Sequence, residues 1–105
     1  MASELASSLI KKLQEKNLTI SVAESLTGGL IAASLTEIPG ASSVFKGSVT
    51  AYVDEIKQSV LNVKNETISN FTSVSEQVAL EMATNVRKIM KSDIGISATG
   101  VAGPE

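Results

Sequence analysis

The stretch SVAESLTGG, residues 21–29, indicates the architecture that the rest of the sequence then repeats. It continues an almost entirely apolar, β-branched run that starts at Leu18, and such a run is typical of a strand buried on both faces. The run breaks at Glu24 into a serine, a threonine and two glycines, and helical spacing of apolar residues resumes at Leu30. A buried strand that turns directly into a helix is typical of an α/β domain.

The remainder of the chain alternates between helical and strand patterns in the same way. Helices are expected at 3–16, 27–38, 54–63 and 73–92, and strands at 18–23, 47–53 and 93–98. The segment 65–71 stays open between a loop and one more helical turn. This order predicts a layered α/β/α domain with a central mixed or mostly parallel sheet, truncated at its C-terminal end.

Polar residues at the starts of these helices are expected to cap them. Ser3 and Asp54 stand where a side-chain oxygen can accept a hydrogen bond from a free backbone N–H group. Ser73 and Glu76 form the Ser-x-x-Glu pattern of a capping box.

The composition excludes several kinds of chemistry. The 105 residues suffice for one domain and contain neither cysteine nor histidine, which excludes thiol nucleophiles, disulfides and Ser-His-Asp triads. A formal net charge of −2 without a basic cluster argues against nucleic-acid binding. No apolar stretch approaches the length of a membrane span, and no secretion signal is visible. We therefore expect a cytoplasmic protein that binds neither nucleic acid nor a membrane.

The turn between the first strand and its helix is a candidate ligand site. Ser25 and Thr27 lie there with two glycines, which allow a ligand to approach the backbone. The first N–H groups of the following helix would favour an anion such as a phosphate. A helix capped by Thr27, with glycines for close packing, fits the same residues, and the local pattern leaves the two interpretations even.

A second loop of small residues, TGVAGPE at 99–105, follows the last expected strand. Ligands of open α/β sheets bind beyond the carboxyl ends of the strands, so two such loops favour a ligand site more than one does. A flexible connection is the alternative interpretation of this second loop.

The loop PGASSVF at 39–45 offers serine hydroxyls, and Lys57 follows in the next helical segment. Without histidine, a serine nucleophile would need another base, and a lysine that is buried or close to other cations can serve. Ile56 and Val60 would allow Lys57 to be partly buried. From this pattern alone, turn serines and a solvated lysine are the commoner outcome.

In this order, the motifs resemble the C-terminal domain of the competence/damage-inducible protein CinA, the nicotinamide mononucleotide deamidase family. The matching stretches are AESLTGG at 23–29, PGASSVFKGSVTAY at 39–52, Lys57, VSEQVALEMA at 74–83 and TGVAGP at 99–104. They cover nearly the whole chain, and five ordered motifs are more specific than any one of them.

The resemblance implies an amidohydrolase that needs no metal or other cofactor. The family hydrolyses the carboxamide of nicotinamide mononucleotide to nicotinic acid mononucleotide and ammonia, so the implied partner is a small nucleotide. It places the nucleophile on Ser42, the base on Lys57 and a further catalytic role on Tyr52, with backbone N–H groups of 40–43 as oxyanion donors. The implied substrate-binding residues are Ser25, Thr27, Gly28, Gly29, Gly40, Thr99, Gly100 and Gly103. A homo-oligomer is expected for the complete protein.

Two residues depart from the family pattern: Leu26, where many members have Cys, and Ala41, where they have Ser. Neither belongs to the expected pair of Ser42 and Lys57. The family domain continues past the loop at 99–104, so residues 1–105 are interpreted as the N-terminal part of a single domain of this kind. A non-catalytic nucleotide-binding or regulatory module, and an inactive fragment, are the alternatives.

Overall fold

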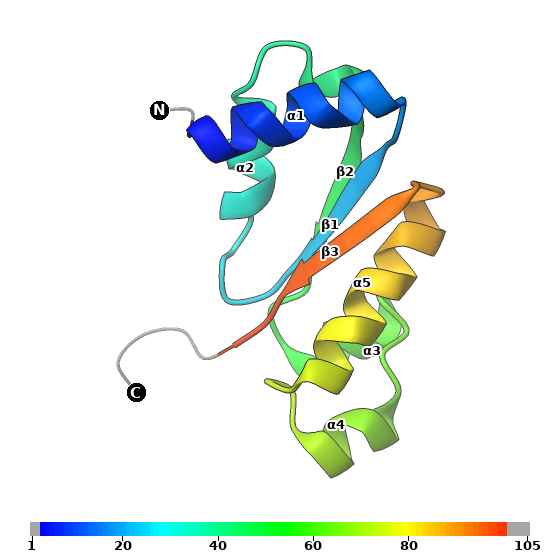
Figure 1. The fold of residues 1–105 in the computed structure, drawn as a ribbon. Coiled ribbons are helices and arrows are strands. Elements are labelled where there is room, and N and C mark those ends of the chain that lie inside the picture. The colour runs from blue at the N-terminus through cyan, green and yellow to red at the C-terminus, as the bar shows by residue number, and fades with distance from the viewer. Residues whose placement is uncertain (1–2, 101–105) are drawn as a thin grey trace.

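The computed structural model describes residues 3–100 as a three-stranded parallel sheet between helices (Figure 1). Its strands are β1 (Ile20–Glu24), β2 (Phe45–Thr50) and β3 (Ile94–Ala98), in the order β2-β1-β3. The first strand of the chain is therefore the central one. The predicted α/β class is confirmed, and the sheet, predicted to be mixed or mostly parallel, is parallel in both of its described pairings.

Helices cover both faces of this sheet. One face carries α1 (Glu4–Lys16) and α2 (Leu30–Thr36). The other carries α5 (Glu76–Met90), with α3 (Asp54–Ser59) and α4 (Asn65–Phe71) beside it. The segment that the sequence left open is thus the helix α4. Within residues 3–100, no helix combines the length and the apolar character that crossing a membrane requires.

The central strand β1 divides the apolar interior into two cores. All five of its residues are buried, and successive side chains point to opposite faces. Ile20 and Val22 pack in the core under α1 and α2, whereas Ala23 packs in the core under α5. Fully burying side chains of the size of Ile20 and Val22 contributes roughly 1.5–3 kcal/mol each.

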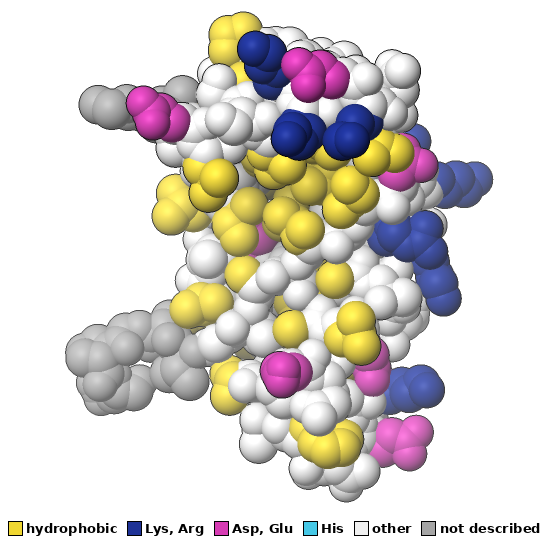
Figure 2. All heavy atoms as spheres, viewed as in Figure 1, with side chains coloured by type: hydrophobic (Ala, Val, Ile, Leu, Met, Phe, Trp, Pro, Cys, Tyr) yellow, Lys and Arg dark blue, Asp and Glu magenta, His cyan; other side chains and the backbone are white. Residues whose placement is uncertain are grey.

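An apolar groove of about 290 Å³ remains open between α1, α2 and the edge strand β3. Figure 2 shows the apolar side chains that gather below α1 on this face. The groove is lined by Ser3, Leu5, Ala6, Leu9, Ile31, Ser34, Leu35 and Ile96.

The helix caps agree with the sequence only in part. The Ser3 hydroxyl accepts a hydrogen bond from the Ala6 N–H at 2.9 Å, so this predicted cap is confirmed. Asp54 is not a cap, because α3 already includes it and Val53 precedes it at the cap position. The cap of α5 is Ser75, which accepts from the Val78 N–H at 3.2 Å, and not the predicted Ser73.

The second strand also lies earlier than predicted. β2 covers 45–50 and not 47–53, because the chain turns after Thr50 and enters α3 at Asp54. This shift moves Tyr52 out of the sheet and into the turn that follows it.

Candidate active site

The carboxyl ends of the three strands meet at one edge of the sheet. Glu24 lies opposite Thr50 in β2 and opposite Ala98 in β3, so the strands end at the same level. Ser25, Tyr52 and Thr99 follow these ends at or near the first position. Ligands of parallel sheets bind beyond this edge, as the sequence led us to expect.

A cleft of about 240 Å³ opens at this edge. It combines residues that are far apart in the sequence, because three strand ends and the loop before α5 converge there. The lining residues are Ser25, Leu26, Tyr52, Asp54, Lys57, Ser73, Val74 and Gly100.

Lys57 lies in this cleft and is only 3% exposed. Its Nζ donates to the backbone carbonyl of Tyr52 at 3.2 Å and to Asp54 Oδ1 at 3.4 Å. The Asp54 side chain is itself about half exposed, so it balances the charge of Lys57 from the rim. Lysine is almost never fully buried unless it is paired, and here the paired carboxylate is itself half exposed. Lys57 is therefore the most unusual side chain of this cleft.

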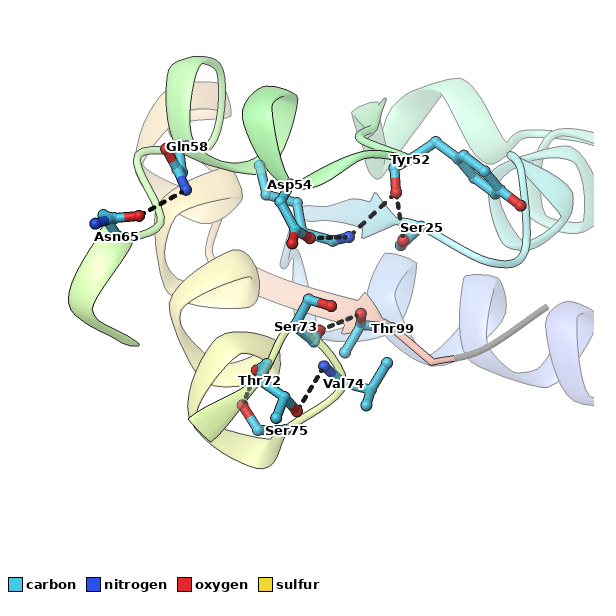
Figure 3. A network of polar contacts seen from close by, with 11 residues as sticks. Ser25, Tyr52, Asp54, Gln58, Asn65, Thr72, Ser73, Val74, Ser75 and Thr99 are labelled. Carbon is cyan, nitrogen blue, oxygen red and sulfur yellow. Dashed lines mark hydrogen bonds and ion pairs between the residues drawn. The ribbon is translucent and has the colours of Figure 1, made fainter. Parts of the chain in front are cut away.

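Ser25 lies beside Lys57 and is equally buried, at 3% exposure. Its backbone N–H donates to the Ala98 carbonyl at 3.0 Å, and its Oγ lies 3.4 Å from the Tyr52 carbonyl oxygen. The Ser25 hydroxyl and the Lys57 ammonium therefore converge on the same carbonyl oxygen. Figure 3 labels Ser25, Tyr52 and Asp54 of this arrangement and marks the contacts as dashed lines.

Ser42 does not lie in this cleft. It belongs to η1 (Ala41–Ser43), which precedes β2, whereas Lys57 follows β2. The six-residue strand between them spans roughly 20 Å at 3.3 Å a residue. Ser42 is exposed and lines a different cleft, with Pro39 and Phe45 among its neighbours. The expected direct pair of Ser42 and Lys57 is therefore wrong for this fold, and Ser25 is the serine next to the lysine.

The oxyanion donors expected in the 40–43 loop are also misplaced. They lie with Ser42 at the opposite edge of the sheet, and two of them are used within the loop. The Ala41 N–H donates to Ile38 and the Ser43 N–H donates to Gly40, both at 3.1 Å. Gly40 ties this loop to α1 by accepting from Gln14 Nε2 at 3.1 Å, so it does not line the Ser25 cleft.

Tyr52 lines the cleft, but its backbone carbonyl makes the contacts there, not its aromatic ring. Its carbonyl accepts both contacts from Ser25 and Lys57. Its side chain is 60% exposed, and Figure 3 shows the ring extending away from that carbonyl.

The start of α2 is filled by a side chain of the protein itself. Glu24 is fully buried, and its carboxylate accepts hydrogen bonds from the N–H groups of Gly29 (3.1 Å), Ile31 (3.0 Å) and Ala32 (2.7 Å). Burial raises the pKa of Glu24, but the neighbouring Thr27 hydroxyl and these three N–H groups lower the pKa by more. The carboxyl therefore stays ionised below its ordinary pKa.

This contact overturns the interpretation of the 24–29 turn as a phosphate site. The N–H groups that would bind the phosphate already donate to Glu24. Thr27 is not the cap either, because Gly29 takes that position. Gly28 and Gly29 have φ angles of +63° and +105°, so the turn requires them for its backbone conformation.

The second glycine-rich loop contributes two described residues. The Thr99 hydroxyl donates to the Ser73 carbonyl at 2.9 Å and so joins the end of β3 to the loop before α5. Gly100 lines the cleft against Leu26. Gly103, the remaining predicted substrate-binding residue, lies outside the described residues.

Four further cleft residues were not predicted as site residues from the sequence: Leu26, Asp54, Ser73 and Val74. Asp54 had a sequence signal, because a carboxylate three positions before a lysine on a helix lies within reach of it. Ser73 and Val74 had none, because only the packing of α5 brings their loop to the sheet edge. Among residues 3–100, no group of three or more acidic, histidine or cysteine side chains could hold a metal ion.

Comparison with known proteins places this chain and its fold in a family. The CinA C-terminal domain family matches residues 2–105. A CinA-like protein of Dictyoglomus turgidum is 54% identical over 92% of the chain, and one of Pseudothermotoga lettingae is 48% identical over 95%. The chain spans about a quarter of the length of these relatives, 24% and 25%.

Solved structures agree with the sequence comparison. The competence damage-inducible protein A of Klebsiella pneumoniae superposes with a TM-score of 0.95 at 33% identity, over 97% of this chain and 63% of its own. A competence/damage inducible protein of Agrobacterium tumefaciens superposes with a TM-score of 0.89 at 40% identity, over 97% and 62%. The chain belongs to the CinA C-terminal domain family.

Proposed function

We propose that this chain carries the nucleophile and the base of an amidohydrolase that cleaves the carboxamide of nicotinamide mononucleotide. The products are nicotinic acid mononucleotide and ammonia. One observation carries the choice of residues: the Ser25 hydroxyl and the buried Nζ of Lys57 converge on the Tyr52 carbonyl. The substrate class rests on the resemblance of the motifs to the deamidase family.

Ser25 is the nucleophile in this proposal. Its Oγ attacks the carboxamide carbon while Lys57, in its neutral form, accepts the hydroxyl proton. The new ammonium group keeps the two acceptors that Nζ has in the structure, the Tyr52 carbonyl and Asp54. A lysine replaces the histidine that this sequence lacks.

The tetrahedral intermediate then loses ammonia. Lys57 returns the proton to the leaving nitrogen, the C–N bond breaks, and the acyl group stays on Ser25 as an ester. Water attacks this ester, Lys57 again transfers the proton, and the carboxylate product leaves Ser25 free. The N–H of Leu26, which follows the nucleophile and lies in the lining of the cleft, is our candidate donor to the oxyanion.

The size of the cleft favours one end of the substrate. At about 240 Å³ it is smaller than the 300–1,000 Å³ typical of ligand pockets. We therefore propose that it takes the pyridine carboxamide, while the ribose and phosphate extend beyond it. Glu24 already occupies the α2 N–H groups, so the phosphate is not held there.

Ammonia release from nicotinamide mononucleotide tests the proposal, with Ser25→Ala and Ser42→Ala as a matched pair. Both remove one serine hydroxyl, one from each edge of the sheet. We expect Ser25→Ala to lose at least about 100-fold in kcat and Ser42→Ala to stay within roughly threefold of the parent. Full activity of Ser25→Ala would contradict the assigned nucleophile.

A second outcome separates this proposal from a binding module. Calorimetric binding of the mononucleotide without ammonia release would favour the module. Loss of activity in Ser42→Ala alone would restore the serine that the family resemblance first suggested.

A further inference from the structure

Glu24 and Ser25 are neighbours in the sequence with opposite surroundings. Side chains alternate along β1, so the Glu24 carboxylate points toward α2, on the side of Ile20 and Val22. The Ser25 hydroxyl points toward Tyr52 and the cleft. One residue therefore faces the helix while the next faces the candidate active site.

The Glu24 carboxylate closes the turn that contains Ser25. Its three hydrogen bonds reach forward five to eight residues, to 29, 31 and 32. Inside this ring the Gly28 N–H donates to the Ser25 carbonyl at 3.0 Å. The backbone of Glu24 is fixed as well, because its carbonyl accepts from the Ala51 N–H at 2.7 Å. The loop is thus held at both of its ends by the same residue.

We infer that Glu24 is a positioning residue, whose carboxylate acts as the resident anion of α2 and fixes the Ser25 hydroxyl against Lys57. The catalytic role of this positioning rests on the proposed function, whereas the hydrogen bonds of Glu24 are observed directly. Charge-assisted hydrogen bonds of this kind are about twice as strong as neutral ones. A glutamine at position 24 would have the same shape, but it would replace one acceptor oxygen by an NH₂ group facing N–H donors.

The test uses Ser25→Cys as a chemical probe, because the natural chain has no other thiol. A thiol beside the Lys57 ammonium ionises more readily and reacts faster with iodoacetamide. Lys57→Met in the probe protein should therefore slow alkylation. We expect Glu24→Gln to slow it as well, roughly 3- to 10-fold, and the two changes together to slow it little more than either alone.

Glu55→Gln is the matched control, because it removes the same negative charge as Glu24→Gln. Glu55 is exposed and lies in the first turn of α3, close to the cleft. It should leave the alkylation rate unchanged. A purely structural Glu24 would lower the unfolding temperature without coupling to Lys57. Equal alkylation rates with and without Glu24→Gln, or fully multiplicative effects with Lys57→Met, would overturn the inference.

A measurement on the unsubstituted protein covers the case in which Glu24→Gln does not fold. If Glu24 is the resident anion, the amide NMR signals of Gly29, Ile31 and Ala32 should not move when inorganic phosphate is added to about 10 mM, which is above the Kd of a weak, millimolar anion site. A saturable shift of these three signals would mean that phosphate displaces Glu24, and would overturn the inference. Neither test requires turnover, so a failure of the proposed amidase activity would be seen separately, in the ammonia assay.

Discussion

The carboxyl and amino edges of the sheet both carry polar loops, but the polar groups of the two edges differ in burial and in hydrogen bonding. At the carboxyl edge, Glu24, Ser25 and Lys57 are all buried. At the amino edge, the contact of Thr19 with Asp93 at 2.8 Å and that of Gln14 with Gly40 are exposed, whereas the buried Ser92 is closely paired with Ser21 at 2.7 Å.

The comparison teaches where to look for function in this fold. Buried polar groups cost stability unless they are well paired, and the side chains of Ser25 and Lys57 have only long contacts, of 3.2–3.4 Å. The exposed contacts of the amino edge carry no such cost. A fold keeps poorly paired buried groups mainly at functional sites, which favours the carboxyl edge.

The largest effect is expected from Lys57→Met. It should reduce ammonia release at least about 100-fold. It should leave the unfolding temperature unchanged or higher, because an apolar side chain replaces a buried charge. Lys46→Met is the control, since Lys46 is exposed in β2, and it should change neither quantity. A marked loss of stability in Lys57→Met would show that the buried lysine is structural.

The second effect compares a packed glycine near the amino edge with an open one at the carboxyl edge. A Cβ at Gly95 would collide with the Ala83 carbonyl oxygen and approach the Cβ of Arg87 to 2.8 Å. Gly95→Ala should therefore destabilise the protein by about 2–3 kcal/mol in urea unfolding, as overpacking does.

Gly28 provides the contrast, because nothing lies within 4 Å of a Cβ there. Its φ of +63° still disfavours a side chain, so Gly28→Ala should cost only about 1 kcal/mol. A larger cost for Gly28→Ala than for Gly95→Ala would reverse the comparison.

Much of the fold could be predicted from the sequence, because periodicity is a local signal. The helix at 4–16 and its cap Ser3 follow directly from spacing and residue type. β1 was recognisable because a strand buried on both faces is continuously apolar. The end of β2 was misplaced, because Thr-Ala-Tyr-Val favours a strand locally and only the turn into α3 ends it.

The site was less predictable, because pairing across strands is not a local signal. The sequence identified Lys57 and the edge of the sheet, but not which serine lies beside the lysine. Ser42 and Ser25 both lie in small-residue loops. Only the parallel register, which makes β1 and β2 end together, brings Ser25 to the lysine and leaves Ser42 a strand away.

A third effect, of intermediate size, tests the loop at 72–75 that enters the cleft. Ser75→Ala removes the cap of α5 and should cost about 1 kcal/mol of unfolding free energy. Ser73 lies nearby in the lining of the cleft. Ser73→Ala should change the unfolding free energy by less than about 0.5 kcal/mol, because the Thr99 hydroxyl donates to the backbone carbonyl of Ser73, which the substitution keeps. Equal costs would mean that the capping box predicted from the sequence also operates.

The smallest effect is expected at the amino edge and depends on pH. The N–H and hydroxyl of Thr19 hold the pKa of Asp93 below its ordinary value of 3.8. A lowered pKa means that the folded state binds this proton less readily than the unfolded state. The resulting stability is complete above pH 3.8 and is lost as the pH falls through the lowered value.

Asp93→Asn should remove this dependence. The unfolding free energy of the parent relative to the variant should therefore decline as the pH falls below 3.8. Parallel curves for the two proteins down to the acid transition would contradict the role of Thr19.

The central position of β1 has a consequence for how the chain is made. Residue 20 pairs with residue 45 on one side and with residue 94 on the other. A ribosome adding roughly 5–20 residues each second therefore exposes one unpaired edge of the nascent hydrophobic strand for several seconds before its last partner is synthesised. Since loop closure over such a distance slows folding, assembly of the sheet should wait until β3 has been synthesised. A chaperone that shields this edge would then act before β3 exists.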